Sequence, residues 1–239
     1  MTTHCTDTTV GEIAAGLPIS ARIFEKYGID FCCGGRVPLA EACQRLGLDA
    51  AAVLEEIDRT AQSPAAEPET DWRTATLTSL AGHIVDTHHV YMKTQLPRLE
   101  SMLQKIIEAH SARHAGVLVP LAATYRAMKE ELDGHLLKEE MILFPLIRAL
   151  ESGSGPRNFH CGRVQNPIRV MLMEHDSAGG ALARMRQLTG GYTPPPDACN
   201  TFRAFYFELA AMEADLHRHI HLENNILFPG AAALESARP

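Results

Sequence analysis

Two eleven-residue segments of this chain are nearly the same, and each carries a histidine and a glutamate four residues apart. The first copy, residues 135–145, reads HLLKEEMILFP, and the second copy, residues 219–229, reads HIHLENNILFP; six of the eleven positions are identical. Because four residues make about one helical turn, the His and the Glu of each copy project from one face of a helix. Imidazole and carboxylate groups placed in this way are typical of half of a metal centre.

Apolar stripes select two more histidines. His89 is in phase with Val85, Met92 and Leu96, whereas His88 fits a poorer stripe, and His175 is in phase with Leu172 and Leu182. The stripes of the repeated segments continue through Ile142 and Ile226. The buried face of the predicted helices therefore receives four histidines and two glutamates, which are His89, His135, Glu139, His175, His219 and Glu223.

The simplest alternative is that such histidines are hydrogen-bonded core residues or lie on solvated faces. The duplication argues against that alternative, because the spacing from His89 to His135 is 46 residues and the spacing from His175 to His219 is 44 residues. Each half of the chain thus repeats the order His, then His-x-x-x-Glu. The other histidines, which include His83, His88, His110, His114 and His221, are expected at the surface, and His160 and Cys161 in a loop.

Four long helices must position these side chains. The pattern predicts helices over residues 75–111, 117–149, 167–189 and 197–228, with Pro97 kinking the first, and short joins indicate an antiparallel four-helix bundle. A small helical domain over residues 1–60 precedes the bundle, with pieces expected at 10–15, 19–27, 39–46 and 50–57. A Pro- and Ala-containing linker over residues 61–71 joins it to the bundle at residues 72–239. The predicted fold class is therefore all-α.

A pair of adjacent cysteines, Cys32 and Cys33, stands before Gly34 and Gly35 in the small domain. Adjacent cysteines form a strained disulfide or remain two thiols. Two approachable thiols of this kind bind soft metals or exchange electrons and disulfides, which makes both residues candidates for a transfer role. The local sequence is equally compatible with a structural role, in which both cysteines pack as small apolar residues in a core. Cys43 is a candidate third sulfur.

Composition narrows the class of protein. The net charge of −7 argues against a nucleic-acid partner, and no uncharged run reaches the length of a membrane span. No secretory signal is visible, and six irregularly spaced cysteines do not indicate a disulfide scaffold, so a cytoplasmic location is expected.

Six protein ligands are too many for one tetrahedral zinc ion. They suit two metal ions that share bridging carboxylates. Mixed imidazole and carboxylate donors fit iron, with manganese or zinc as alternative occupants.

The His-x-x-x-Glu arrangement in four helices resembles hemerythrin-like domains. Over nearly the whole chain the sequence also resembles the iron–sulfur cluster repair di-iron proteins, through FCCGG (31–35), KEEMILFP (138–145), MEHDSAG (173–179), TPPPDAC (193–199) and HLENNILFP (221–229). The resemblance implies two non-haem iron ions, carboxylate- and oxo-bridged. The four histidines would be terminal ligands, and Glu139 and Glu223 would be the bridges. It also places Cys32 and Cys33 in the motif of the N-terminal domain. Oxygen-carrying hemerythrins often have another His at the position of Gly179, so one coordination position is expected to stay open.

The resemblance implies a stress-response function, the repair of iron–sulfur clusters damaged by nitric oxide or oxidation. Damaged iron–sulfur proteins would be the clients, nitric oxide or dioxygen a small ligand, and a homodimer is an assembly that the sequence allows. Three other functions stay open, which are a di-iron nitric oxide reductase, an oxygen or nitric oxide sensor or carrier, and a structural metal bundle.

Overall fold

The structure is a computed structural model that describes residues 4–62, 70–153 and 162–237. The expected linker at 61–71 and the loop at 151–165 lie partly outside these residues, and His160 and Cys161 lie wholly outside them. Within the described residues the regular structure is helical, and one isolated bridge pairs Thr9 with Pro38. The fold is all-α, as the sequence predicts.

The contacts of the chain divide it into two compact units. The first unit comprises residues 1–81, 147–157 and 217–239, and the second comprises residues 82–146 and 158–216. The C-terminal residues from 217 onward are thus grouped with the N-terminal helices.

Four short helices open the first unit, close to the positions that the sequence predicts. Thr9 and Glu12 form a reciprocal capping box at the first helix, and Asp49 caps the fourth through the amide of Ala51. Gly28 and Gly47 end the second and third helices with φ of +68°, a conformation that favours glycine. The helices are α1 (Val10–Gly16), α2 (Ser20–Tyr27), α3 (Leu39–Leu46) and α4 (Ala50–Ala61). Their apolar faces enclose a core that includes Phe24, Phe31 and Ile57.

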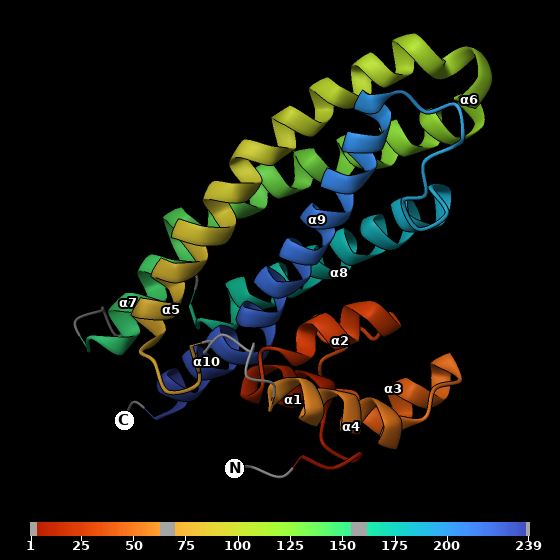
Figure 1. The fold of residues 1–239 in the computed structure, drawn as a ribbon. Helices are drawn as coiled ribbons and strands as arrows, with labels where there is room; N and C mark the ends of the chain where they lie inside the picture. Colours follow the sequence, from red (N-terminus) through yellow and green to blue (C-terminus); the bar gives the residue numbers. More distant parts are fainter. Residues whose placement is uncertain (1–3, 63–69, 154–161, 238–239) are drawn as a thin grey trace. The chain divides into compact units, whose positions relative to one another are not determined.

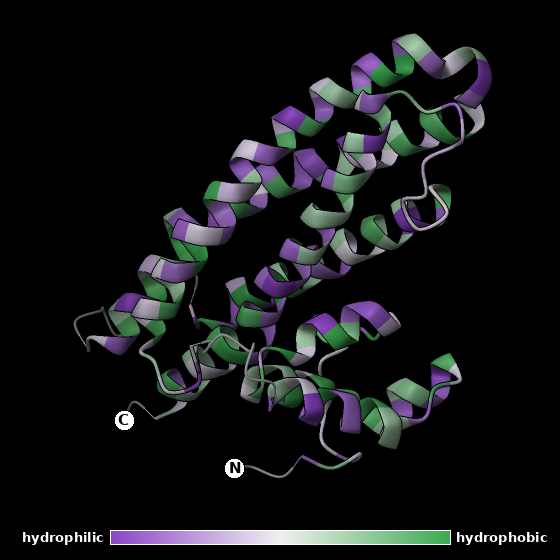
Figure 2. Cartoon of the chain, viewed as in Figure 1, coloured by the Kyte–Doolittle hydropathy of each residue, from purple (hydrophilic) through white to green (hydrophobic). Residues whose placement is uncertain are grey.

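Among the described residues, four long helical segments lie in the second unit. Two of them are the arms of α6 (Val90–Lys138), which doubles back at His114 so that the arms lie side by side (Figure 1). The other two are α8 (Gln165–Leu188) and α9 (Asn200–Leu222), the latter belonging to this unit as far as Leu216. The break expected between residues 111 and 117 is therefore a single non-helical residue, His114, with φ of −121° and ψ of 18°. Each long helix carries both hydrophilic and hydrophobic residues (Figure 2).

In the described residues three π-helical turns interrupt the helices, and the sequence pattern did not predict them. They are η1 (Ile84–His89), which follows α5 (Leu77–His83), η2 (Glu139–Leu143), which leads into α7 (Phe144–Glu151), and η3 (Glu223–Leu227), which leads into α10 (Phe228–Ser236). In η2 the amide of Phe144 donates to the carbonyl of Glu139, and in η3 the amide of Phe228 donates to that of Glu223.

A proline ends each repeat, two residues after two of these turns. Pro145 and Pro229 have no N–H, and in an α-helix their rings would collide with the carbonyl four residues earlier. A wider i→i+5 turn avoids that collision and adds one residue to the turn.

The extra residue corrects two predictions about burial. Ile142 was expected on the buried stripe but is 54% exposed, and Leu143 is buried in its place. In the second copy Ile226 is half-buried, and Leu227 takes the buried position. A strict α-helical period placed both stripes one residue too early beyond the glutamates.

In the described part of the chain, none of the helices combines the length and the apolar character that a membrane crossing requires.

Candidate metal centre

Four buried histidines and two buried glutamates converge in two groups. The first group contains His89, Glu139, His219 and Glu223, and the second contains His135, Glu139, His175 and Glu223. Within each group one nitrogen or oxygen atom per residue lies within 4.8 Å of all the others. The two glutamates belong to both groups. All six residues that the sequence selected are therefore brought together, and none is more than 2% exposed.

The ring nitrogens and carboxylate oxygens face one another at short range. The two oxygens of Glu139 point at different histidines, with Oε2 3.4 Å from Nε2 of His89 and Oε1 3.3 Å from Nε2 of His135. In the second copy, Nε2 of His219 lies 3.3 Å from Oε1 of Glu223.

The contact between His135 and His175 is the best test of whether this donor set fits a metal. Their Nε2 atoms lie 3.1 Å apart. Two imidazole nitrogens that bind one metal at about 2.0–2.1 Å are separated by about 3 Å. With two carboxylates shared between the groups, the residues fit a pair of metal ions.

The helices place these donors at their irregular turns. Glu139 and Glu223 each begin a π turn, and His89 ends one. Such turns are frequent at functional sites, because the extra residue re-aims a side chain without ending the helix.

Two outer carboxylates hold the far sides of two histidine rings. Nδ1 of His89 lies 2.7 Å from Oε1 of Glu140, which also accepts from Lys93. Nδ1 of His135 lies 2.8 Å from Oε2 of Glu174, whose other oxygen, Oε1, accepts from Lys138. A ring that donates from Nδ1 presents the lone pair of Nε2 to the centre.

The charge of both outer carboxylates is secured by their lysines and histidines. Burial raises the pKa of Glu140, but hydrogen bonds from Lys93 and His89 outweigh it and bring the pKa below its ordinary value. The pKa of Glu174 is lowered against its burial in the same way, by Lys138 and His135. Both groups therefore stay ionised at neutral pH. The sequence pattern predicted Glu140 as surface charge, with a hydrogen bond to a ligand imidazole left open, and it predicted no role for Glu174.

Replacing Glu140 or Glu174 with glutamine should weaken metal binding without abolishing it. An amide keeps the shape but removes the negative charge that orients the imidazole, and outer partners of this kind are worth about 10–100-fold in affinity. Metal competition with a chelator measures the loss. Glu131→Gln, at an exposed position on α6, is the matched control. Unchanged affinity in both variants would contradict the role of the outer carboxylates.

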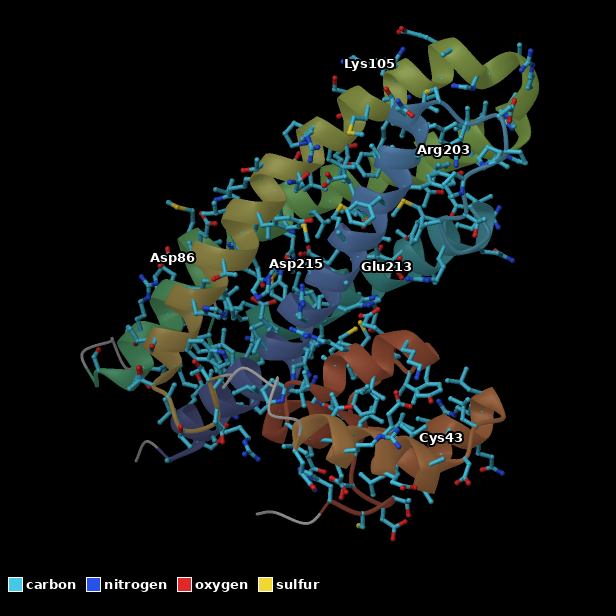
Figure 3. The ribbon with its side chains drawn as sticks, in the orientation of Figure 1. Cys43, Asp86, Lys105, Arg203, Glu213 and Asp215 are labelled. Atoms are coloured by element: carbon cyan, nitrogen blue, oxygen red, sulfur yellow. The ribbon has the colours of Figure 1, made fainter. Side chains whose placement is uncertain are left out.

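The expectation that His88 and His221 lie at the surface is wrong. Each is 5% exposed. His88 places Nδ1 3.1 Å from both carboxylate oxygens of Asp215, which Figure 3 labels on α9. His221 places Nδ1 3.3 Å from the carbonyl oxygen of Phe31. Both buried polar rings are thus satisfied by partners within the protein that sequence spacing could not reveal.

His89, and not His88, should carry the metal from the first helical segment. A shift of one residue turns a side chain by about 100° around the helix, and His88 is directed to Asp215. We expect His89→Ala to lose at least about ten-fold in metal affinity and His88→Ala to keep its metal. Elemental analysis of both purified variants checks this, and the reverse result would show that the assigned helix phase is wrong.

The two adjacent cysteines differ in exposure. Cys32 is 5% exposed and Cys33 is half-buried, so the expectation of two approachable thiols is wrong for Cys32. The Cys32 sulfur lies 4.0 Å from that of Cys33 and 3.3 Å from Oδ1 of Asp30. The contact with Cys33, burial and the negative Asp30 hold the pKa of Cys32 well above its usual range. Cys33 is therefore the sulfur that a reagent reaches first.

The remaining described cysteines show no such pairing with each other. Cys43, labelled in Figure 3, is fully buried in the apolar core of the small helices, and burial raises the pKa of its thiol. Its surroundings are those of a packed apolar residue. Cys5 and Cys199 are exposed.

Known proteins share both parts of this chain. The family model of the hemerythrin HHE cation binding domain matches residues 80–231, and a model described as a domain of unknown function, DUF542, matches residues 6–61. A protein of Citrobacter koseri named iron-sulfur cluster repair protein YtfE is 39% identical over 229 residues, which cover 96% of this chain and 98% of that relative. Proteins with the same name from Edwardsiella ictaluri (40% over 225 residues, 94% and 96%) and Escherichia coli (39% over 231 residues, 96% and 98%) are similar over comparable lengths.

Proposed function

We propose that this chain, which belongs to the hemerythrin HHE cation-binding family and to the family of the iron-sulfur cluster repair protein YtfE, repairs iron–sulfur clusters damaged by nitric oxide or oxidative stress. The observation that carries the proposal is the pair of buried His and Glu groups inside the region that the hemerythrin model matches. Similarity over more than nine-tenths of the chain supports the extension to the repair function.

The metal ions in this proposal are two non-haem irons. His89 and His219 would hold one, His135 and His175 the other, and Glu139 and Glu223 would bridge them. The two groups share these carboxylates and divide the histidines in this way, which supports the assignment. An additional oxo bridge remains a prediction that an optical spectrum tests.

Bound iron would supply redox chemistry and a source of releasable metal. The protein would supply a dry site, because every donor side chain is buried. Glu140 and Glu174 would keep two imidazoles oriented. The position four residues after His175 is Gly179, which offers no side-chain ligand and supports an open coordination position for nitric oxide or dioxygen.

The role proposed for Cys32 and Cys33 is transfer of electrons or metal. Neither belongs to the two groups found among the described residues, and both lie in the region that the second family model matches. The proposal also includes a small domain at residues 1–60, a linker at 61–71 and a bundle at 72–239. Damaged iron–sulfur proteins would be the clients, the location would be cytoplasmic, and the protein would form a homodimer.

A repair assay tests this function directly. A [4Fe–4S] enzyme inactivated by nitric oxide is incubated with the purified, iron-loaded protein and a thiol reductant. We expect about two irons per chain and recovery of the enzyme beyond that given by free iron. Full iron loading without recovery would refute the repair function.

Two measurements separate the rival functions. Turnover of nitric oxide to nitrous oxide with a reductant would favour a reductase, in which the metal centre would reduce nitric oxide. Reversible binding of gas with no loss of iron would favour a sensor or carrier.

A further inference from the structure

At three of the positions where the two copies of the repeated segment differ, the side chains make different contacts in each copy. Where the first copy has Leu137, Glu140 and Met141, the second has His221, Asn224 and Asn225. In the first copy Leu137 is 59% and Met141 69% exposed. The corresponding residues of the second copy contact the loop that contains the adjacent cysteines.

The contacts are made to backbone carbonyl groups of that loop. Nδ2 of Asn225 lies 3.2 Å from the carbonyl oxygen of Phe31, 3.3 Å from that of Cys32 and 3.0 Å from Nδ1 of His221. Nδ2 of Asn224 lies 3.5 Å from the Cys32 carbonyl oxygen. These contacts fix the backbone of the loop at Phe31 and Cys32.

Two glycines make room for the Asn225 amide. A Cβ atom at Gly35 would lie 2.3 Å from Oδ1 of Asn225, and one at Gly11 would lie 2.6 Å from the same atom. The amide of Gly11 donates to the carbonyl of Gly35 at 2.8 Å, which ties the end of the cysteine loop to α1. This packing explains why the second glycine of the Cys-Cys-Gly-Gly motif, Gly35, has no side chain.

The same short segment carries two of the six candidate metal donors, His219 and Glu223. His221 lies between His219 and Glu223, and Asn224 and Asn225 belong to the π turn that Glu223 begins. A change in that turn displaces the amides that hold the loop. All of these residues lie in the first compact unit.

We propose that His221, Asn224 and Asn225 form a loop seat that positions the Cys32–Cys33 loop on the turn carrying Glu223, so that metal occupancy controls the reactivity of the thiols. The proposal rests on the proposed metal centre and transfer role. With metal bound, Glu223 fixes the turn and the seat holds the loop closed. Without metal, the turn relaxes and the thiols become more accessible.

Alkylation by iodoacetamide, followed residue by residue by mass spectrometry, tests the loop seat in the full-length protein. Wild-type protein with iron should be alkylated slowly at Cys32, and removal of iron by a chelator should raise that rate about ten-fold, the factor expected when one or two hydrogen bonds no longer oppose local opening. Asn225→Asp, which places a carboxylate against two carbonyl oxygens, should react at the raised rate even with iron bound.

Three further variants separate a positioning role from a general structural one. His221→Leu, which restores the residue of the first copy, should react quickly, whereas His221→Asn, which keeps a polar atom near the Nδ1 position, should react slowly. Met141→Asn, the matched change in the first copy, should leave the rate unchanged. Gly35→Ala should displace Asn225 without altering any donor, so it provides a second route if Asn225→Asp fails to fold.

The outcome is decided by rate and iron content together. The loop seat would be overturned if both Asn225→Asp and Gly35→Ala were alkylated at the wild-type rate. It would also be overturned if removal of iron left the alkylation rate of the wild-type protein unchanged. None of these readouts uses the repair assay. Failure of repair with an intact iron-dependent alkylation rate would therefore refute the proposed function alone.

Discussion

Replacing Glu139 and Glu223 with leucine, singly or together, is expected to cost the protein its iron pair. Each carboxylate belongs to both groups of the candidate centre, so one substitution would remove an oxygen donor from both proposed metal ions at once. Loss of an outer partner already costs about 10–100-fold in metal affinity, and loss of a bridging ligand should cost at least that much. Iron content after purification measures the effect. Full iron content in both single variants would refute the assignment.

The stability of the same variants gives an independent check. Wild-type protein should lose thermal stability when a chelator removes iron, because a metal that binds only the folded state stabilises it. The double leucine variant should show no such dependence. It should also match or exceed the metal-free wild type, since burial of a polar side chain costs free energy that an apolar side chain avoids. Lower stability than metal-free wild type would mean that the glutamates have a structural role of their own.

Replacing Cys32 and Cys33 together with serine should leave the iron content and the optical spectrum intact and abolish repair. The sulfurs are outside both groups found among the described residues, so metal binding is not expected to depend on them. Serine is close in size to cysteine, and the backbone carbonyl groups held by Asn225 remain in place. Iron content and recovery of a nitric-oxide-damaged enzyme are measured on the same preparation.

Single substitutions then show which of the two thiols reacts first with a thiol reagent. Cys33 is the more exposed, and Cys32 has a raised pKa, so Cys33→Ser should slow the first reaction with a thiol reagent more than Cys32→Ser does. Cys5→Ser, at an exposed position, is the control. Retained repair in the double variant would make the thiols dispensable, and loss of iron would make them ligands.

The repeated His-x-x-x-Glu and the apolar stripes were enough to predict the all-α fold and the convergence of six buried side chains. Those signals are local, because a single helix face records its own burial in its own sequence. The phase of His89 against His88 was readable for the same reason. The stripes went out of register beyond Glu139 and Glu223, where a π turn adds a residue. Pro145 and Pro229 were the available signal for these turns.

Contacts between distant segments were not readable. His88 is buried against Asp215, 127 positions further along the chain, and His221 is buried against Phe31, 190 positions away. The local sequence around a histidine does not show whether its ring is buried against a distant partner or exposed to solvent. Glu174 was missed because its contact with His135 joins two helices, although its position next to His175 made it a neighbour of the centre in sequence.

The π turn at Glu139 gives the exposed residue Ile142 an unusual evolutionary constraint. Its side chain is more than half exposed, so many residue types should be tolerated there. Its peptide unit lies within the wide turn, and deleting it would rotate α7 relative to the helix before it. Substitutions at this position should therefore accumulate among relatives while the length of the segment between Glu139 and Pro145 stays fixed.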